Sequence, residues 1–482
     1  MIKNKVSVIL LALASVSFSS RAVAEDNAIA DTLYLSLDQC IEIALDKNPT
    51  IKVADMKIQR VDYSKKEIIG QLFPDISFGG TYSRTLAKQT MYMNLSSFGG
   101  GATGGNSDEN AATDESSSKP ANNGIKVGLD NSYQVGFTAA MPIIAPQLWK
   151  SISLSNAQIL QNVESARASR LSLINQVQNT YYTLLLAKDS YLVVKQNYDN
   201  AVFTAAIVEG NYKVGAASEY ELLRAKVQVK NVEPDLLQSE IAIKQATLQL
   251  KVLMGIDIEV PVSVASQLSD YQQSMYETVL NINRSDISGN TDLRALDLQT
   301  DYLKKAVTVQ KMSWSPTLAL TANYHWTTMN NGTPFKNLQW NPYSSVGVTL
   351  SIPIFQGGQR IYKVKQAQVA VNELGFQRET LERSIRMQVD LQIDNISKQV
   401  KQIDTNEAGM QEAEKAYSII QKSYQIGAAS FLDLRDAELA LTASKLAYYQ
   451  AIYNYLVANS DLQLLLGNAD IEKYQPSYKY KN

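Results

Sequence analysis

One motif occurs twice in this chain, with the same spacing in both copies. The first copy reads Tyr212-Lys-Val-Gly215-Ala216-Ala217-Ser218-Glu-Tyr-Glu221, and the second reads Tyr424-Gln-Ile-Gly427-Ala428-Ala429-Ser430-Phe-Leu-Asp433. The copies lie 212 residues apart, and the offset still holds where Leu253-Met-Gly255 corresponds to Leu465-Leu-Gly467. A match over such a span without a slip indicates an internal repeat. The duplication predicts two pseudo-symmetric halves, which suit a symmetric assembly better than a single catalytic pocket.

Each copy lies between two predicted helices. We expect these helices at about 147–210 and 218–254 in the first half, and at about 359–426 and 430–466 in the second. At 1.5 Å per residue, a helix of about 65 residues is about 100 Å long. Ordinary globular helices are much shorter, so these helices are predicted to lie in a coiled-coil-like array. They are rich in Ala, Gln, Ser and Asn and only weakly apolar, as expected for the wall of a hollow tube.

Four segments alternate apolar with small or polar residues, at about 74–86, 131–142, 316–328 and 343–353. A period of two predicts strands with one apolar and one polar face, and transmembrane β-barrel strands have this pattern. A two-sheet sandwich is the alternative. Against the sandwich, only four strands are expected, and they sit at one end of helices that are too long to cover them.

Four strands cannot close a barrel, and an open sheet edge cannot face lipid. Two chains would give eight strands with a filled interior, whereas three chains would give twelve strands and leave a lumen. The expected fold class is therefore an α+β membrane protein in which several copies of the chain close one barrel.

The first 24 residues predict a secretory signal peptide. Lys3 and Lys5 form a basic region, Val6–Phe18 is apolar, and Ala22-Val-Ala24 is an A-x-A cleavage site. This order of features is typical of secreted bacterial proteins. We expect the mature chain to begin at Glu25.

The repeat divides the mature chain into four parts. These are a first repeat at 25–255, an inter-repeat segment at 256–289, a second repeat at 290–467 and a C-terminal tail at 468–482. The first repeat also carries a longer hairpin loop, Ser96–Gly124, rich in Gly, Ser, Asn and acidic residues. This composition predicts a disordered loop facing solvent.

Composition excludes several classes of function. The net charge of −2 gives no basic face for nucleic acid. His325 is the only histidine, so a His-rich metal site is excluded, and a lumen or interface position in a strand is expected for it. Cys40 is the only cysteine and is expected to be buried in a short helix. We therefore expect no enzyme activity and no cofactor.

With these features in place, the chain resembles the outer membrane efflux protein family, the TolC-like channels. Besides the two repeated turns, the segments that carry the resemblance are Leu37–Pro49, Leu72-Phe-Pro74, Trp314-Ser-Pro316 and Ile352-Pro-Ile-Phe-Gln-Gly-Gly358. The resemblance implies a homotrimer with a 12-stranded outer-membrane β-barrel and a periplasmic α-helical barrel. It also implies an exit duct for tripartite efflux or type I secretion. An inner-membrane pump of the RND or ABC type and a periplasmic adaptor (membrane fusion protein) would supply the substrates. The alternative is a trimeric stalk, adhesin or passive porin-like protein whose surface loop does the work.

The resemblance places an iris-like gate at the two repeated turns. It implies a cation-binding ring of Asp433 and Asp436, with Glu221, Arg224 and Tyr424 as further gate residues. Glu221 and Asp433 also fit capping boxes with the serine three residues before each, whereas Asp436 has no capping role. Some members of the family carry a basic residue where this chain has Ala429. Arg224 is therefore the first candidate for the basic side chain of the gate, and it would pair with Asp436 across protomers.

The same resemblance implies that an adaptor docks on the turns. The expected docking residues are Val214, Gly215, Ala216, Ser218, Ile426, Gly427, Ala428 and Ser430.

Overall fold

The computed structural model describes residues 33–91, 125–271, 286–468 and 471–474. The signal peptide expected at 1–24 and the loop expected at 96–124 lie outside these residues.

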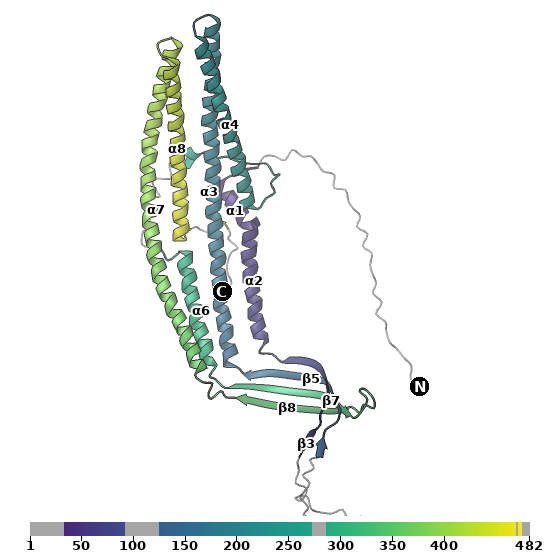
Figure 1. Cartoon of the computed structure of the whole chain (residues 1–482). Helices are drawn as coiled ribbons and strands as arrows, with labels where there is room; N and C mark the ends of the chain where they lie inside the picture. Colours follow the sequence, from purple (N-terminus) through teal and green to yellow (C-terminus); the bar gives the residue numbers. More distant parts are fainter. Residues whose placement is uncertain (1–32, 92–124, 272–285, 469–470, 475–482) are drawn as a thin grey trace, which may run out of the picture.

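The described chain is a long helical shaft with a β-sheet at one end (Figure 1). Four helices form two hairpins: α3 (Pro146–Lys213) with α4 (Glu219–Met254), and α7 (Gln359–Gln425) with α8 (Phe431–Leu466). The long members have 68 and 67 residues and the short members have 36 each. The shaft therefore contains two hairpins of nearly equal size, and both end in turns at the same end of the molecule.

Two shorter helices complete the shaft. Helix α2 (Pro49–Gly70) continues the line of α4 along α3, and α6 (Thr291–Met312) continues the line of α8 along α7 (Figure 1). Helix α1 (Leu37–Lys47) packs beside α3 and α4. The short segments β1 (Leu33–Leu35) and β6 (Val262–Val264) pair in parallel. The short helix η2 (Leu268–Tyr271) packs against α3 and α8, and α9 (Ile471–Tyr474) packs against α1.

An asparagine joins the helices at each of the two end-to-end junctions. Asn48 caps the start of α2 and also donates its side-chain amide to the carbonyl oxygen of Leu253 in α4, at 2.7 Å. Asn290 caps the start of α6 and donates in the same way to Leu465 in α8, at 2.7 Å. One polar side chain therefore satisfies an N-terminal amide of one helix and a C-terminal carbonyl of the next, where both lack intrahelical partners.

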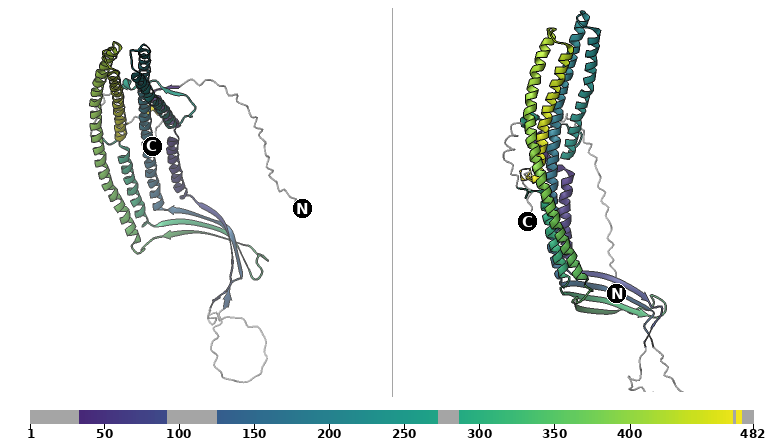
Figure 2. Two further views of the ribbon diagram at one scale, coloured as in Figure 1. Left: turned by 45° about the horizontal axis from the view of Figure 1, so that its top comes forward. Right: turned by 60° about the vertical axis from the view of Figure 1, so that its left-hand side comes forward.

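The sheet contains four antiparallel strands in the order β2 (Asp75–Arg84), β5 (Asn131–Ile144), β7 (Thr317–Asn330) and β8 (Asn341–Ser351). The short strands β3 (Gln89–Met91) and β4 (Ile125–Val127) pair separately. The four long strands leave the shaft at an angle, as two further views show (Figure 2). Among the strands that the structure describes, the outer strands β2 and β8 each pair on one side only.

The two faces of the sheet differ in chemistry, because successive side chains in a strand point to opposite sides. One row pairs Phe78 with Phe137 and Phe137 with Tyr324. The adjacent row pairs Gly79 with Gly136 and Gly136 with His325. His325 thus belongs to the polar face, where a Cβ added at Gly136 would come 2.4 Å from His325 Nδ1.

The main core lies in the middle of the shaft. Its fully buried members include Ile41 of α1, Tyr181 of α3 and Ile452 of α8. Cys40 is completely buried there, as the sequence predicts, and burial raises the pKa of its thiol to about 12. Within the described ranges, none of the helices combines the length and apolarity needed to cross a bilayer.

Candidate functional site

The two repeated turns close the hairpins in the same way. Gly215 has φ 77° and Gly427 has φ 74°, a left-handed conformation that glycine adopts without a steric cost. The amide of Gly215 donates to the carbonyl of Tyr212 at 3.0 Å, and the amide of Gly427 donates to that of Tyr424 at 3.0 Å. Each glycine therefore stops a helix of more than sixty residues and reverses the chain.

Each turn is followed by a capping box. The amide of Ser218 donates to the Glu221 carboxylate at 2.9 Å, and the Glu221 amide donates to the Ser218 hydroxyl at 3.2 Å. In the second turn the Ser430 amide donates to the Asp433 carboxylate at 3.0 Å, and the Asp433 amide donates to the Ser430 hydroxyl at 3.2 Å. The capping interpretation of Glu221 and Asp433 is thus confirmed, and both acids start a helix.

The two acids of the expected cation ring differ in their surroundings. The hydroxyl of Ser430 donates to the Asp433 carboxylate at 2.7 Å and, with the Ser430 amide, holds the pKa of that carboxyl below its usual value. Asp436 is exposed one turn further along α8. Both side chains are exposed, so the two acids differ in the hydrogen bonds that hold the Asp433 carboxylate rather than in their access to solvent.

Contacts between the two hairpins involve three of the predicted gate residues. The guanidinium of Arg224 lies over the ring of Phe431, with its central carbon 5.8 Å from the ring centroid. Tyr424 is half-buried, and its pKa is raised by burial and, to a lesser extent, by the charge of Glu221. Within the described residues Arg224 forms no ion pair with Asp436, so their pairing across protomers stays a prediction.

Near the turns a small buried cluster holds the hairpins together. Its buried members are Val208, Leu222, Ala225 and Phe431. Tyr424 and Ala217 pack against this tip cluster. The interior side of the turns is therefore apolar, but it is far smaller than the core in the middle of the shaft.

The outer side of the turns is open to solvent. Val214 is 78% exposed and Ile426 is 81% exposed. The remaining residues expected to dock an adaptor are also exposed: Gly215, Ala216, Ser218, Gly427, Ala428 and Ser430. Two branched apolar side chains thus stand out from a surface of small residues.

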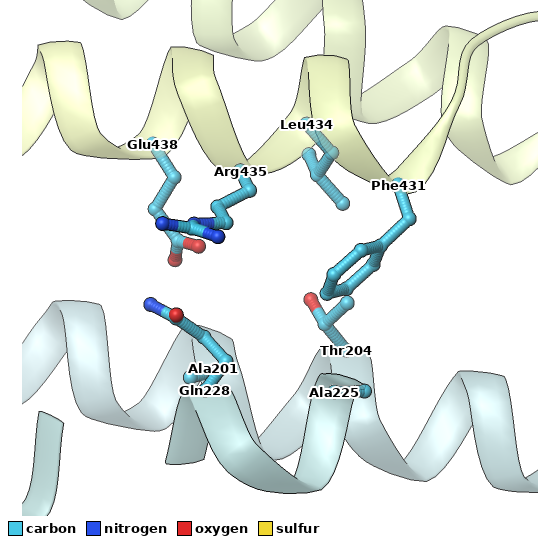
Figure 3. Close-up of a pocket in the computed structure, with 8 residues that line it drawn as sticks. All are labelled: Ala201, Thr204, Ala225, Gln228, Phe431, Leu434, Arg435 and Glu438. Carbon is cyan, nitrogen blue, oxygen red and sulfur yellow. The ribbon is translucent and has the colours of Figure 1, made fainter. Parts of the chain in front are cut away.

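Glu438 belongs to this region but was not among the residues predicted from the sequence. It is 6% exposed on α8 and lines a small cavity between α8 and the α3–α4 hairpin (Figure 3). The sequence does contain a signal for it, because Phe431, Leu434, Glu438 and Leu441 follow helical spacing and the other three are apolar.

No cluster of three or more metal-ligating side chains occurs within residues 33–91, 125–271, 286–468 and 471–474. A cation site built from Asp433 and Asp436 would therefore need these residues from more than one chain.

The family pattern for outer membrane efflux proteins matches residues 40–256 and 285–468, so the chain belongs to this family. Outer membrane efflux proteins are channels rather than enzymes, and the chain is an outer-membrane exit duct with a periplasmic tunnel.

Curated relatives cover most of the chain at low identity. The pyoverdine export outer membrane protein OpmQ of Pseudomonas aeruginosa is 22% identical over 364 residues, which are 74% of this chain and 73% of that protein. The outer membrane protein TolC of Escherichia coli K12 is 22% identical over 355 residues, which are 72% of this chain and 71% of TolC.

Solved structures share the fold. The Campylobacter jejuni CmeC outer membrane channel superimposes with a TM-score of 0.67 at 18% identity, covering 92% of this chain and 88% of that chain. CusC superimposes with a TM-score of 0.67 at 18% identity, covering 90% of this chain and 93% of that chain.

Proposed function

We propose that this chain is one protomer of a homotrimeric exit duct with a gate at its periplasmic turns. The four long strands would form one third of a 12-stranded barrel, and the shaft would form one third of the helical tunnel. In this proposal the two halves, 25–255 and 290–467, are pseudo-equivalent repeats joined by an equatorial segment at 256–289, with the tail at 468–482 in the periplasm.

The main observation in support of a multimeric barrel is that one chain supplies only part of a sheet. Strands β2 and β8 each have an unpaired edge, and all ten residues of β2 are exposed, among them Ile76 and Phe78. An apolar sheet face with open edges is stable in lipid only when partner strands satisfy the edge amides and carbonyls. Further copies of the chain supply such strands, and three copies give a barrel wide enough for a lumen.

The shaft also indicates that several copies of the chain assemble. Large apolar side chains are exposed along its helices, including Ile241 at 56%, Phe376 at 71% and Leu391 at 60%. Apolar surface distributed over the length of a single chain is expected where neighbouring copies pack against it. The shaft is therefore proposed to be a segment of a wall whose remaining segments are other protomers.

The turns are proposed to receive a periplasmic adaptor. Val214 and Ile426 protrude from small residues, which leaves room for another helical hairpin to meet them tip to tip. The adaptor would connect the duct to an inner-membrane pump of the RND or ABC type. The relatives OpmQ and AprF are described as serving pyoverdine export and alkaline protease secretion, so one duct architecture serves small and large cargo in them.

The test combines assembly, conduction and transport. The purified protein is expected to have the mass of three chains and to form channels in planar bilayers. Cells lacking it should accumulate more drug or dye, and V214D with I426D should reproduce that accumulation while still forming trimers. Q245D, at an exposed polar position of α4 far from the turns, is the matched control and should leave efflux intact. Unchanged accumulation with lost surface binding would instead favour the adhesin alternative, and a monomer in a native membrane extract would contradict the proposal.

A further inference from the structure

A buried carboxyl group lies between the two helix hairpins near their turns. Glu438 of α8 is 6% exposed, and Phe431, Leu434 and Leu441 are buried on the same helix. These residues recur at spacings of three and four, so they share one face of α8. Glu438 therefore stands where the packing of α8 otherwise has an apolar side chain.

The carboxyl group of Glu438 lies at the wall of a small cavity. The cavity has a volume of about 10 Å³, which is at the lower limit for holding a single water molecule. Besides Glu438 it is lined by Ala201, Thr204, Ala225, Gln228, Phe431, Leu434 and Arg435 (Figure 3). Glu438 Oε1 and Arg435 Nε are both buried, and neither has a hydrogen-bond partner within the part of the chain that the structure describes. A buried polar atom without a partner is costly, and a charged one more so.

The neighbouring elements provide little charge to stabilise an ionised carboxylate. Helices α3 and α4 line the cavity only with uncharged residues. Helix α7 contributes Tyr417, whose pKa is raised by burial and by the charge of Glu438. Arg435, on α8 itself, is the one cationic group that lines the cavity.

Burial raises the pKa of Glu438 from 4.5 to about 7, and a hydrogen bond from the Asn200 side chain offsets part of that rise. The packed arrangement thus favours the neutral acid over the carboxylate, because burial disfavours the charged form.

Near the turns, the apolar contact that holds the two hairpins together is small. It consists of the tip cluster, in which Phe431 is the only buried residue from the α7–α8 hairpin. Regions with few buried apolar contacts open at a low free-energy cost. A change of charge two turns from Phe431 is therefore well placed to shift the balance between packed and separated turns.

We propose that Glu438 is a proton switch for the periplasmic gate. Its neutral form keeps α8 packed against α3 and α4, and its ionised form releases α8 so that the turns move apart. This inference rests on the proposed function, since release of α8 matters only if the turns close a duct.

Proton linkage gives the direction of the effect. The packed arrangement binds the proton of Glu438 more tightly than an arrangement in which the carboxyl group is in water, so acid favours the packed form. Between pH 4.5 and about 7 the solvated group ionises while the packed one stays neutral, so the ratio of open to closed increases. Above about pH 7 both forms are ionised, and the increase is complete.

The first measurement is single-channel recording in planar bilayers. With the two pKa values 4.5 and about 7, the ratio of open to closed should rise from pH 5 to pH 7.5 by about 50-fold for each protomer that releases α8. E438Q keeps the shape of the side chain but cannot ionise, so its channel should stay at the closed level over this range. E412Q changes an exposed glutamate of α7 and is the control, which should follow the wild-type curve.

The second measurement does not require conduction. T204C introduces a thiol into the wall of the cavity, and its labelling by a neutral maleimide reports separation of α8 from α3. Labelling of T204C relative to Q411C, at an exposed position, should increase over the same pH range and should not increase in the E438Q background. Cys40 is completely buried and does not interfere.

The outcomes separate the two proposals. Channels whose gating and labelling have the same pH dependence in wild type and E438Q would overturn the proton switch and leave the duct intact. Labelling of T204C that depends on pH and on Glu438, in a protein that conducts at no pH, would support the switch and contradict the duct. If E438Q fails to assemble, T204C labelling that is flat with pH in the otherwise wild-type chain still overturns the switch.

Discussion

The guanidinium of Arg224 lies over the aromatic ring of Phe431, 5.8 Å from its centroid. Arg224 belongs to α4 and Phe431 to α8, so this contact joins the two helix hairpins next to their turns. Phe431 is buried in the tip cluster, so the arginine covers an apolar contact between the hairpins. The pair therefore stabilises the arrangement in which the turns are packed together.

Removal of the arginine should loosen the turns. R224A deletes a cation–π contact that at an exposed site is worth about 0.5–1 kcal/mol, so the ratio of open to closed is expected to rise about 2- to 5-fold. Open probability in planar bilayers measures this ratio. K226A, two residues away at an exposed position of α4, is the control and should leave it unchanged. An equal effect of both variants would show that net charge, rather than the contact with Phe431, is responsible.

The two aspartates should contribute unequally to block by multivalent cations. D436N is expected to weaken block more than D433N, because the Asp433 carboxylate is already held by hydrogen bonds from Ser430, whereas Asp436, which is likewise exposed, has no capping role. The double variant should weaken block most, and D436A should also raise single-channel conductance. The concentration for half-maximal block, measured from the periplasmic side, is the readout.

A matched control for the aspartates lies on the other hairpin. E219Q neutralises an exposed acid in the first turn of α4, close to the same end of the shaft. If E219Q weakens block as strongly as D436N, the cation responds to the overall charge of the turns and no specific ring exists. Unchanged block in the double variant would place the cation site elsewhere.

The local structure of the turns could be predicted from the sequence, while the contacts between hairpins could not. Gly427, Ser430 and Asp433 determine a turn and a cap through their own backbone and side chains, so their roles follow from spacing alone. The partner of Arg224 depends on which helix packs against α4, and the sequence suggested Asp436 rather than Phe431. The spacing of Glu438 places it on the apolar face of α8, but its neighbours Thr204 and Gln228 are more than two hundred residues away in the chain and could not be predicted.

The Ser430 cap should make the start of α8 sensitive to mutation. S430A removes the acceptor of the Asp433 amide and a donor to its carboxylate, so amide exchange in the first turn of α8 should speed up about fivefold. S418A, whose hydroxyl only donates to a carbonyl within α7, is the control and should change little.

The same cap predicts a pH dependence. The pKa of Asp433 is below its ordinary value of 3.8 because Ser430 donates to the carboxylate. A lowered pKa means that the contribution of the ionised acid is complete above pH 3.8 and is lost as the pH falls through the lower, native value. Hydrogen exchange followed by mass spectrometry should therefore show no loss of wild-type protection in the first turn of α8 as the pH falls from 7 to 5. Protection of α8 that declines already between these values would contradict a role for Asp433 in the cap.

Gly467 should be the most sensitive of the helix-terminal glycines. It has φ 68° at the end of α8, and a Cβ added there would lie 1.9 Å from the carbonyl oxygen of Gly289, next to the Asn290 junction. G467A combines an unfavourable backbone conformation with a clash against main chain that no side-chain rotation relieves, so it should cost more than about 2 kcal/mol. G255A, whose added Cβ would lie 2.9 Å from the carbonyl oxygen of Lys47, should cost less. G409A lies within α7 with no atom in reach of its Cβ, so it should be neutral or slightly stabilising.

The apparent unfolding temperatures should therefore rank G467A lowest, G255A next and G409A at or above wild type. Any other order would mean that the junction between α8 and α6 relaxes more readily than its backbone contacts imply.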